Sequence, residues 1–181
     1  MLRFWYNQFM KLSLAVSKFI NADIEYNLAK IKEAYQINDD VDMVCFAESF
    51  LQGFDALDFN FEHDKRIAIS QDDLIIKELC RMTKGENRAL SFGYFELCLG
   101  KIYSSYMTIF DGEIINNYRR ITKTWKDYRY CDEHYDEGKE IREFHFMGHD
   151  FMIALCGDLF LKQRVSRQRG SCFGQSMSIF P

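Results

Sequence analysis

Residues 86–110 read ENRALSFGYFELCLGKIYSSYMTIF, and apolar residues fall on most sides of the helical wheel that they would form. A helix that is apolar nearly all round belongs in a protein interior. Gly93 and Gly100 are seven positions apart on one face of this helix, where a neighbouring helix could approach closely. We therefore predict that residues 86–110 form a central buried helix and that the other elements pack around it.

The flanking sequence carries apolar residues at the spacing of amphipathic helices. We expect further helices over residues 4–20, 24–35, 41–52, 74–84, 114–128 and 141–161. Asn21 or Asp23 can cap the second of these helices. The sequence Ser70-Gln-Asp-Asp73 is a variant of the capping box ahead of the helix at 74–84. Pro181 is the only proline, so no proline interrupts any of these helices.

The dipeptide Asp111-Gly112 is typical of a tight hairpin turn. The residues that follow favour a helix instead, because Ile114, Tyr118 and Ile121 recur at helical spacing. One short β-hairpin remains an option near residues 58–69, where apolar and polar residues alternate. The predicted fold class is therefore mostly α. It is a single-domain bundle of six to eight helices over residues 1–165, with a loose basic tail at 166–181.

The composition excludes several classes of protein. The net charge is −4 and the pI is about 5.6, so a basic surface for nucleic acid is absent. Polar residues interrupt the apolar N-terminus, so we expect neither a signal peptide nor a membrane span. No two cysteines form a CxxC pair, which favours reduced, buried cysteines in a cytoplasmic protein. The cysteines are Cys45, Cys80, Cys98, Cys131, Cys156 and Cys172.

A surface rich in carboxylates and tyrosines is predicted between residues 127 and 143. Carboxylates steer a basic partner toward a surface, and tyrosines add contact area at low entropy cost. We therefore predict a non-catalytic inhibitor of the immunity or antitoxin type that masks a basic protein, such as a toxin or a nuclease. This interpretation requires no cofactor and no metal. The residues expected to bind the partner are Tyr130, Asp132, Glu133, Tyr135, Asp136 and Glu137.

A second group of residues supports an alternative function. Its members are Arg142, His145, His149 and Asp150. On a helix, His145 and His149 would share a face, because they are four positions apart, and such a pair suits two metal ligands. Arg142 lies on the same face, and its positive charge disfavours a cation there.

The spacing of arginine and histidine in Arg129…His134 and in Arg142…His149 resembles that of the HEPN ribonucleases, an all-helical family. This resemblance implies a homodimer in which the arginine holds a phosphate and the histidine performs acid–base chemistry. The dipeptide His149-Asp150 resembles the HD motif of metal-dependent phosphohydrolases. The alternative function is therefore a ribonuclease or a metal-dependent phosphohydrolase.

Overall fold

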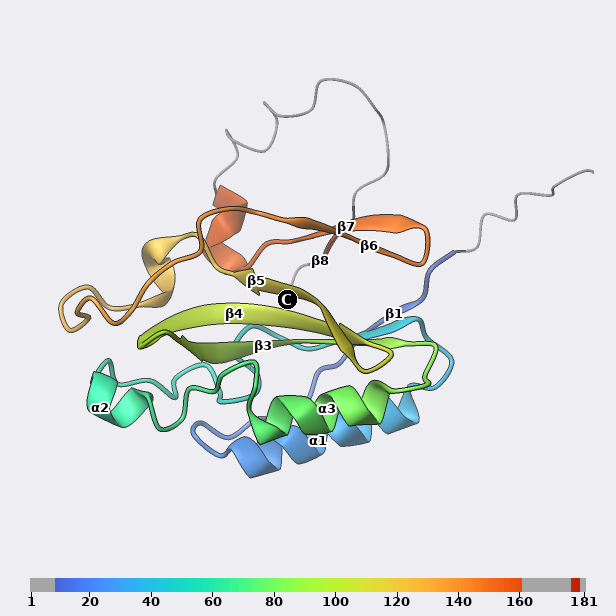
Figure 1. Ribbon diagram of the computed structural model, residues 1–181, viewed down its shortest axis with the longest axis horizontal. Coiled ribbons are helices and arrows are strands. Elements are labelled where there is room, and N and C mark those ends of the chain that lie inside the picture. The colour runs from blue at the N-terminus through green and yellow to red at the C-terminus, as the bar shows by residue number, and fades with distance from the viewer. Residues whose placement is uncertain (1–8, 161–176, 180–181) are drawn as a thin grey trace, which may run out of the picture.

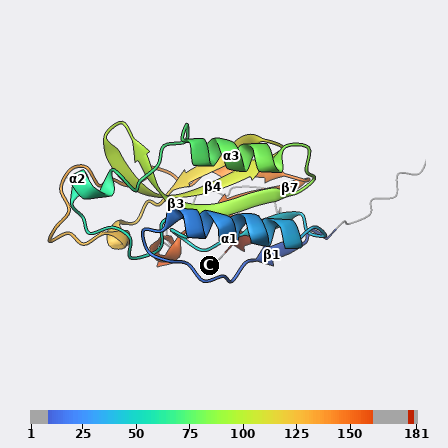
Figure 2. The same ribbon diagram turned by 90° about the horizontal axis from the view of Figure 1, so that it is seen from below.

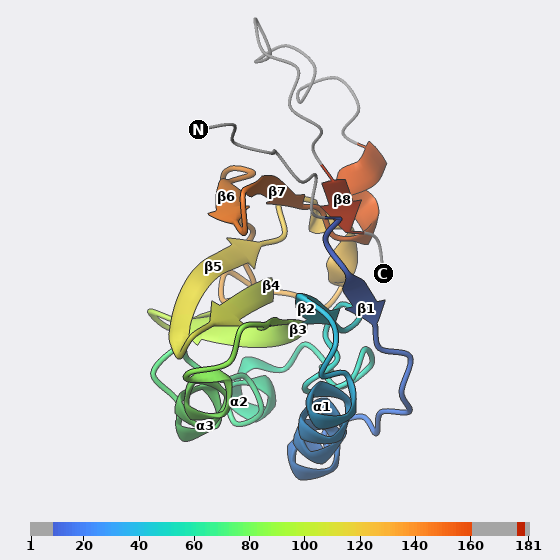
Figure 3. The same cartoon turned by 90° about the vertical axis from the view of Figure 1, so that its right-hand side faces the viewer.

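Three layers make up the part of the chain that the structure, a computed structural model, describes: residues 9–160 and 177–179. Helices α1 (Ile24–Ile37) and α3 (Leu74–Thr83) cover one face of a five-stranded sheet, and a three-stranded sheet covers the other (Figure 1, Figure 3). The remaining described helical segments are short: α2 (Phe61–Asp64) and the 3₁₀ turns η1 (Lys123–Trp125) and η2 (Cys156–Phe160).

The first sheet combines parallel and antiparallel strands. Its strands, in order across the sheet, are β1 (Leu12–Leu14), β2 (Met43–Cys45), β3 (Ala89–Cys98), β4 (Lys101–Phe110) and β5 (Glu113–Arg119). The pairs β1–β2 and β2–β3 are parallel and require crossover connections, in which α1 and α3 lie side by side on one face (Figure 2). Tight turns connect β3, β4 and β5 as antiparallel neighbours. The carboxyl ends of β2, β3 and β5 therefore lie at the same edge.

The second sheet packs on the first through aromatic side chains. It consists of β6 (Glu143–Phe146), β7 (His149–Ile153) and β8 (Met177–Ile179). Its inward-facing residues include Phe144, Phe146 and Phe151, which form one apolar cluster with Tyr106 and Tyr118 of the first sheet. The outward-facing residues of β6 are exposed, so its burial alternates along the strand.

The predicted helical bundle is wrong, because the described chain has an α/β fold built on a mixed sheet. The predicted central helix at 86–110 is the hairpin of β3 and β4. The first eight residues of β3 are all buried, since one face lies under α1 and α3 and the other under the second sheet, the loop after β2 and a third apolar cluster. A strand buried on both faces is apolar at nearly every position, so its period of two is hidden.

Four more of the predicted helices are wrong, and strands take their place. The Asp111-Gly112 dipeptide does form a hairpin turn, with φ values of 48° and 82°, and β5 occupies the first part of the predicted 114–128 helix. The predicted 141–161 helix is the β6–β7 hairpin followed by η2, and the predicted 41–52 helix is β2 with the loop after it. Within the described part of the predicted 4–20 helix, the regular element is β1.

Two predicted helices, those at 24–35 and 74–84, are confirmed as α1 and α3. The Asp23 carboxylate accepts a hydrogen bond from the backbone N–H of Tyr26 over 3.0 Å and caps α1. Asp73 caps α3 in the same way, with Ile75 as the donor at 2.9 Å. Each helix packs one face on the sheet and exposes the other, so the helical period is visible in its sequence.

Three further expectations concern the optional hairpin, the basic tail and a membrane-spanning helix. The option of a hairpin near residues 58–69 is not realised, since α2 lies there. Most of the predicted basic tail falls outside the described residues, and Met177–Ile179 pair with β7 as β8. Among the described residues, no helix has the length and apolarity needed to cross a lipid bilayer.

Candidate active site

The ends of β2 and β5 place an acidic and a basic side chain together inside the protein. Glu48 lies in the loop after β2, and Arg120 directly follows β5. Nη1 of Arg120 is 2.7 Å from Oε1 of Glu48, and the two side chains are only 3% and 6% exposed. A pair of charges buried so deeply requires good geometry and further hydrogen bonds to remain stable.

Three hydroxyl groups supply these hydrogen bonds. Ser104 Oγ donates to Oε1 of Glu48 over 3.1 Å. Arg120 donates through Nε to Thr122 Oγ1 at 2.9 Å and through Nη2 to Thr124 Oγ1 at 2.6 Å. All three guanidinium nitrogens are therefore engaged, which fixes the orientation of this group.

The loop that carries Glu48 presses directly on β3, and a glycine makes this contact possible. A Cβ atom at Gly93 would lie 2.3 Å from the backbone nitrogen of Ser49 and 2.6 Å from Cα of Glu48. Ser49 itself has a φ of 56°, a strained value for a residue with a side chain. The close approach predicted at Gly93 does occur, but a loop makes it instead of a neighbouring helix.

A cysteine stands at the strained turn that follows β7. The residues just before the turn are buried, whereas Cys156 is exposed and has a φ of 33°. Such a conformation costs a residue with a Cβ atom about 1–2 kcal/mol. Strain of this kind is found where surrounding contacts enforce it, and it clusters at functional sites. Of the cysteines in the described ranges, Cys156 alone is classed as exposed.

The turn that carries Cys156 packs on Arg120. A Cβ atom at Gly157 would lie 2.6 Å from Nη2 of Arg120 and 2.4 Å from Oγ1 of Thr124. A residue with a side chain does not fit there unless the guanidinium moves. Cys156 therefore directly precedes Gly157, whose backbone packs against the Arg120 side chain of the buried ion pair.

Asp158 connects this turn to the end of β5. Its carboxylate accepts hydrogen bonds from the hydroxyl of Tyr118 at 2.6 Å, from the backbone of Thr122 at 2.9 Å and from the backbone of Leu155 at 3.1 Å. Burial, together with the Asp158 carboxylate, raises the pKa of Tyr118, so its hydroxyl remains a donor. Asp158 is buried, and water does not compete for these bonds.

Cys156, Glu48 and Arg120 combine the groups that nucleophilic catalysis requires. A cysteine thiolate can attack an electrophilic carbon, and a nearby carboxylate can accept and return a proton. A guanidinium remains charged at every pH at which proteins are folded, so Arg120 can stabilise negative charge but cannot transfer a proton. Within the buried pair, Glu48 is therefore the group able to carry a proton.

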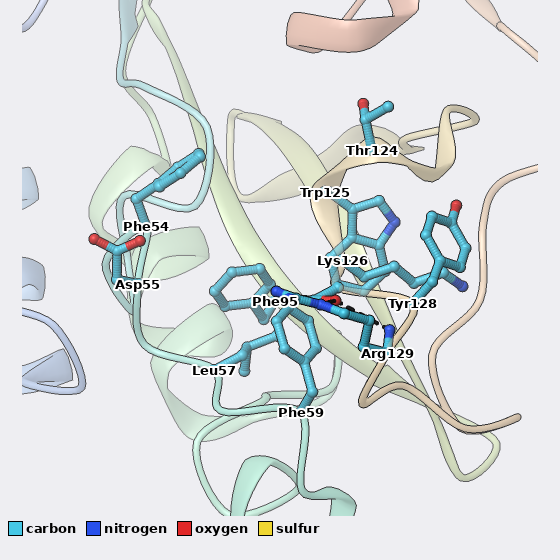
Figure 4. A pocket seen from close by; sticks show the side chains of 11 residues that line it. Phe54, Asp55, Leu57, Phe59, Phe95, Thr124, Trp125, Lys126, Tyr128 and Arg129 are labelled. Atoms are coloured by element: carbon cyan, nitrogen blue, oxygen red, sulfur yellow. Dashed lines mark hydrogen bonds and ion pairs between the residues drawn. The ribbon is translucent and has the colours of Figure 1, made fainter.

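A pocket of about 520 Å³ lies between the loop after β2 and the segment that follows Arg120 (Figure 4). Thr124, which contacts Arg120 and Gly157, forms part of its lining. The walls come from the loop after Glu48, from β3 and from the segment after Arg120. Such a volume is typical of a site for a small molecule. The aromatic lining residues are Phe54, Phe59, Phe95, Trp125 and Tyr128.

Residues 13–150 match the model of a protein family described as carbon-nitrogen hydrolase. The matched residues make up more than half of the chain and include Glu48 and Arg120. The chain belongs to the carbon-nitrogen hydrolase family. No curated protein sequence matches this chain.

Solved structures resemble this chain in fold. A CN-hydrolase superfamily protein from Xanthomonas campestris, with an arsenic adduct in its active site, has a TM-score of 0.72 and 17% identity, covering 94% of this chain and 64% of that chain. A glutamine-dependent NAD+ synthetase from Acinetobacter baumannii has a TM-score of 0.66 and 21% identity, with 88% and 30% covered.

An amidase from Nesterenkonia sp. AN1, in a mutant with acrylamide added to its active-site cysteine, has a TM-score of 0.66 and 13% identity. The match covers 83% of this chain and 59% of the amidase. The chain therefore spans between 30% and 64% of the length of these three proteins.

The family corrects the predicted function. A non-catalytic inhibitor of the immunity or antitoxin type is wrong, because the matched family is one of hydrolases. The alternative of a ribonuclease or a metal-dependent phosphohydrolase is also wrong. It depended on an all-helical fold and on a helical row of histidines, and residues 143–153 form strands instead.

The structure places the alternative residues on and just before the β6–β7 hairpin. His145 and Asp150 lie opposite each other across the strands, with Nδ1 and Oδ1 2.9 Å apart, and both side chains are about two-thirds exposed. Arg142 pairs with Glu140 at 2.7 Å on the surface. His149 is exposed at the start of β7. Across the described residues, no hydrogen bond or ion pair joins this group to the buried Glu48–Arg120 pair.

The six residues predicted to bind a partner lie in the segment between η1 and β6. Tyr135 is only 3% exposed, and its hydroxyl donates to a buried carboxylate, so the structure does not place it at the surface. Asp136 and Glu137 form ion pairs with Lys101 and Lys126. The binding of a basic protein stays a prediction. The exposed members of the group are Tyr130, Asp132 and Glu133.

One cluster in the described residues has atoms at the spacing of a metal site: Asp58, His63 and Asp64. Asp64 is completely buried, and its oxygens already accept hydrogen bonds from the Tyr135 hydroxyl and from the backbone of Asp58 and Phe59. These donors use the lone pairs that a cation would need. The cluster is accounted for by internal hydrogen bonding.

No sequence pattern indicated Glu48, Arg120 or Cys156 as site residues. Glu48 and Arg120 fall within the predicted helices at 41–52 and 114–128, and Cys156 is one of the cysteines predicted to be buried. One pattern could have indicated the site. The apolar run 151–155 stops abruptly at Cys156-Gly157, as a buried strand does when a tight turn follows it.

Proposed function

We propose that the chain hydrolyses the carbon–nitrogen bond of an amide, with Cys156 as the nucleophile. One observation carries the proposal. The exposed Cys156 stands at a strained turn whose next residue packs on the buried Glu48–Arg120 pair. The family match supports the reaction class but ends at residue 150, so the role of Cys156 rests on its position in the structure.

The first half of the reaction forms a thioester. The Cys156 thiol gives its proton to the Glu48 carboxylate, and the sulfur forms a bond to the carbonyl carbon of the amide. The carbonyl oxygen becomes an oxyanion, which the Arg120 guanidinium stabilises. The carbon–nitrogen bond breaks as Glu48 returns the proton to the leaving nitrogen.

The second half releases the acid. A water molecule gives a proton to Glu48 and attacks the thioester carbon. The new tetrahedral intermediate collapses, the carbon–sulfur bond breaks, and the proton on Glu48 returns to the sulfur. The products are a carboxylic acid and ammonia or an amine, and the enzyme regains its thiol.

Two features of the chain and its relatives support this scheme. The Nesterenkonia amidase carries an acrylamide adduct at its active-site cysteine. The five described cysteines of this chain form no disulfide with one another. A nucleophilic thiol requires a reducing compartment, so we propose the cytoplasm as the location.

The test measures ammonia release from simple primary amides. We expect hydrolysis by the wild-type protein, and we expect the Cys156→Ala variant to be slower by at least about 1,000-fold, because the nucleophile is lost. The matched control is Cys80→Ala, which alters a half-buried cysteine of α3 on the opposite face of the first sheet. This variant should keep the wild-type rate.

Labelling provides an independent readout. Acrylamide should add to Cys156 faster than to the other cysteines, as followed by peptide mass spectrometry. Ammonia release by Cys156→Ala at the wild-type rate, or acrylamide addition that ignores Cys156, would overturn the proposal.

A further inference from the structure

Aromatic rings from three separate parts of the chain form most of the apolar part of the pocket lining. Phe54 and Phe59 lie in the loop that begins with Glu48, Phe95 lies on β3, and Trp125 and Tyr128 follow Arg120 (Figure 4). The Phe95 and Trp125 rings stack with their centroids 6.2 Å apart. These rings present flat apolar surfaces, which are well suited to a ring of the ligand.

The pocket is joined to the reacting groups through Thr124. The Thr124 hydroxyl accepts a hydrogen bond from Arg120 and would lie 2.4 Å from a Cβ atom at Gly157. Trp125 is the next residue in the sequence and lines the same pocket. A substrate whose carbonyl group lies at Cys156 would therefore have its acyl chain close to the mouth of the pocket.

Both cations that line the pocket are already paired. Lys126 Nζ lies 2.6 Å from a carboxylate oxygen of Glu137, and the two side chains are 8% and 13% exposed. Arg129 makes two hydrogen bonds to Asp127, at 3.0 and 2.6 Å. These bonds lower the pKa of Asp127 to about 2, so this pair stays charged and intact near neutral pH.

One lining charge is left without a partner. Asp55 forms no ion pair with any residue of the described ranges, and its position on the pocket adds a negative charge there. An anionic acyl group would find no unpaired cation among the lining residues to neutralise it. The pocket therefore disfavours acidic substrates.

We infer that the substrate of this site is an amide with an uncharged aromatic acyl group, whose ring packs against Phe59 and the stacked pair of Phe95 and Trp125. The inference rests on the proposed function for the position of the carbonyl group. A pocket of about 520 Å³ accommodates an arylalkyl group, and burial of its ring favours such a substrate.

Three primary amides test the preference: 3-phenylpropanamide, propanamide and succinamate. We expect kcat/KM for 3-phenylpropanamide to exceed that for propanamide by about tenfold or more, because the buried ring adds contacts in the pocket. Succinamate, whose acyl group carries a carboxylate and no cation, should be the poorest of the three. Calorimetric titration of the Cys156→Ala variant gives the same ranking as binding constants, without turnover.

Two phenylalanines form a matched pair of variants. Phe59 is one of the three rings proposed to hold the ligand ring, so Phe59→Leu, which keeps an apolar side chain, should weaken the binding of 3-phenylpropanamide severalfold more than that of propanamide. Phe9 is 89% exposed and is not among the lining residues, so Phe9→Leu should change neither. Trp125→Phe keeps an aromatic face and should bind the ligand better than Trp125→Ala.

The two proposals fail in different ways. If Cys156→Ala binds 3-phenylpropanamide no better than propanamide, the aromatic specificity is wrong, whatever the wild-type protein hydrolyses. If the variant prefers the aromatic amide while the wild-type protein releases no ammonia from it, the hydrolytic function is wrong and the aromatic pocket is upheld.

Discussion

At the scale of single residues, Glu48 and Arg120 depend on each other, because neither charge could remain buried alone. The carboxylate of Glu48 compensates the charge of the buried guanidinium. Three hydroxyl groups contribute further hydrogen bonds to the pair. Removing one member of such a pair leaves the other charge uncompensated in a medium of low polarity. The pair is therefore both part of the proposed chemistry and a condition for folding.

The Glu48→Gln variant measures this dependence. Glutamine keeps the shape of the side chain but removes its charge, and we expect the free energy of unfolding to fall by about 3–5 kcal/mol. Urea denaturation followed by circular dichroism provides the measurement. Glu33→Gln is the control, since Glu33 pairs with Lys30 on the surface and its loss should have no resolvable effect. Equal effects of the two variants would contradict the argument.

Sequence reasoning could not assemble the site because its members are far apart along the chain. Glu48 and Arg120 are separated by 72 positions and meet only through the register of the first sheet. Cys156 is marked by its exposure and its positive φ, and neither property can be seen in an apolar run of sequence. The histidines drew attention because their spacing suits a helix that does not exist.

At the scale of elements, three hairpin turns share one unusual backbone. Each has two residues with positive φ, and in each the first is not glycine: Leu99 at 50°, Asp111 at 48° and Met147 at 48°. Two-residue turns of this kind match the twist of the flanking strands. Asparagine and aspartate tolerate this conformation better than leucine or methionine. Leu99 and Met147 therefore stabilise their turns less than asparagine or aspartate would at the same positions.

Leu99→Asn should make the protein more stable. Leu99 is 99% exposed, so its replacement removes no packing, and asparagine relieves about 1 kcal/mol of backbone strain. Thermal unfolding would show a higher midpoint. Leu99→Ala is the control, because alanine has the same Cβ atom in the same conformation and should give no gain. An equal gain in both variants would show that backbone strain is not the cause.

A buried carboxylate holds β3, β4 and β5 together on the helix-facing side of the sheet. Glu96 is 1% exposed and accepts two hydrogen bonds of 2.8 Å from Arg119 and one of 2.7 Å from Ser105. Burial raises the pKa of Glu96, but the hydrogen bonds from Arg119, Gln71 and Ser105 outweigh it and lower the pKa overall. The folded state therefore holds this proton less tightly than the unfolded state does.

Glu96 makes the free energy of unfolding depend on pH. Because the folded pKa lies below the ordinary value of 4.5, Glu96 contributes stability above that pH and loses it as the pH falls through the folded pKa. We expect the unfolding free energy of Glu96→Gln to fall less steeply than that of the wild type below about pH 4.5. Glu25→Gln, at an exposed position of α1, should keep the wild-type slope. Identical slopes for all three proteins would refute this role of Glu96.

The elements that could be predicted are those with one face in water. The helices α1 and α3 have an apolar stripe, a polar face and an aspartate cap, so periodicity and capping agree. The strands β3 and β4 have no face in water over most of their length, and the interior makes them apolar at consecutive positions. Composition then indicates burial but not whether the buried element is a helix or a strand.

At the scale of the whole molecule, the two sheets should unfold as one unit. Phe151 is 2% exposed between them and stacks on Phe144 with a centroid distance of 5.3 Å. Phe151→Ala should lower the free energy of unfolding by about 3–5 kcal/mol, because it leaves a cavity in the shared core. Circular dichroism and tryptophan fluorescence should still report the same transition. Separate transitions would show that the sheets are independent.

The composition of the whole chain did not distinguish the two fold classes. An apolar content of 48% suits a helical core and a double-sheet core equally well. The single terminal proline permits long helices but does not require them. What separates the two fold classes is whether buried segments pair as strands, and that pairing depends on contacts between residues distant in sequence.

The positions of Gly93 and Gly157 in the site do not tolerate a larger residue, whereas other parts of the site do. Alanine at either position would enter space that the Glu48 backbone or the Arg120 guanidinium occupies. The pocket walls, in contrast, lie mostly on loops, and Phe54 is more than half exposed. Mutations in the loops can thus change which ligand the pocket binds while the Glu48–Arg120 frame stays the same, so the site can diverge in specificity and keep the proposed chemistry.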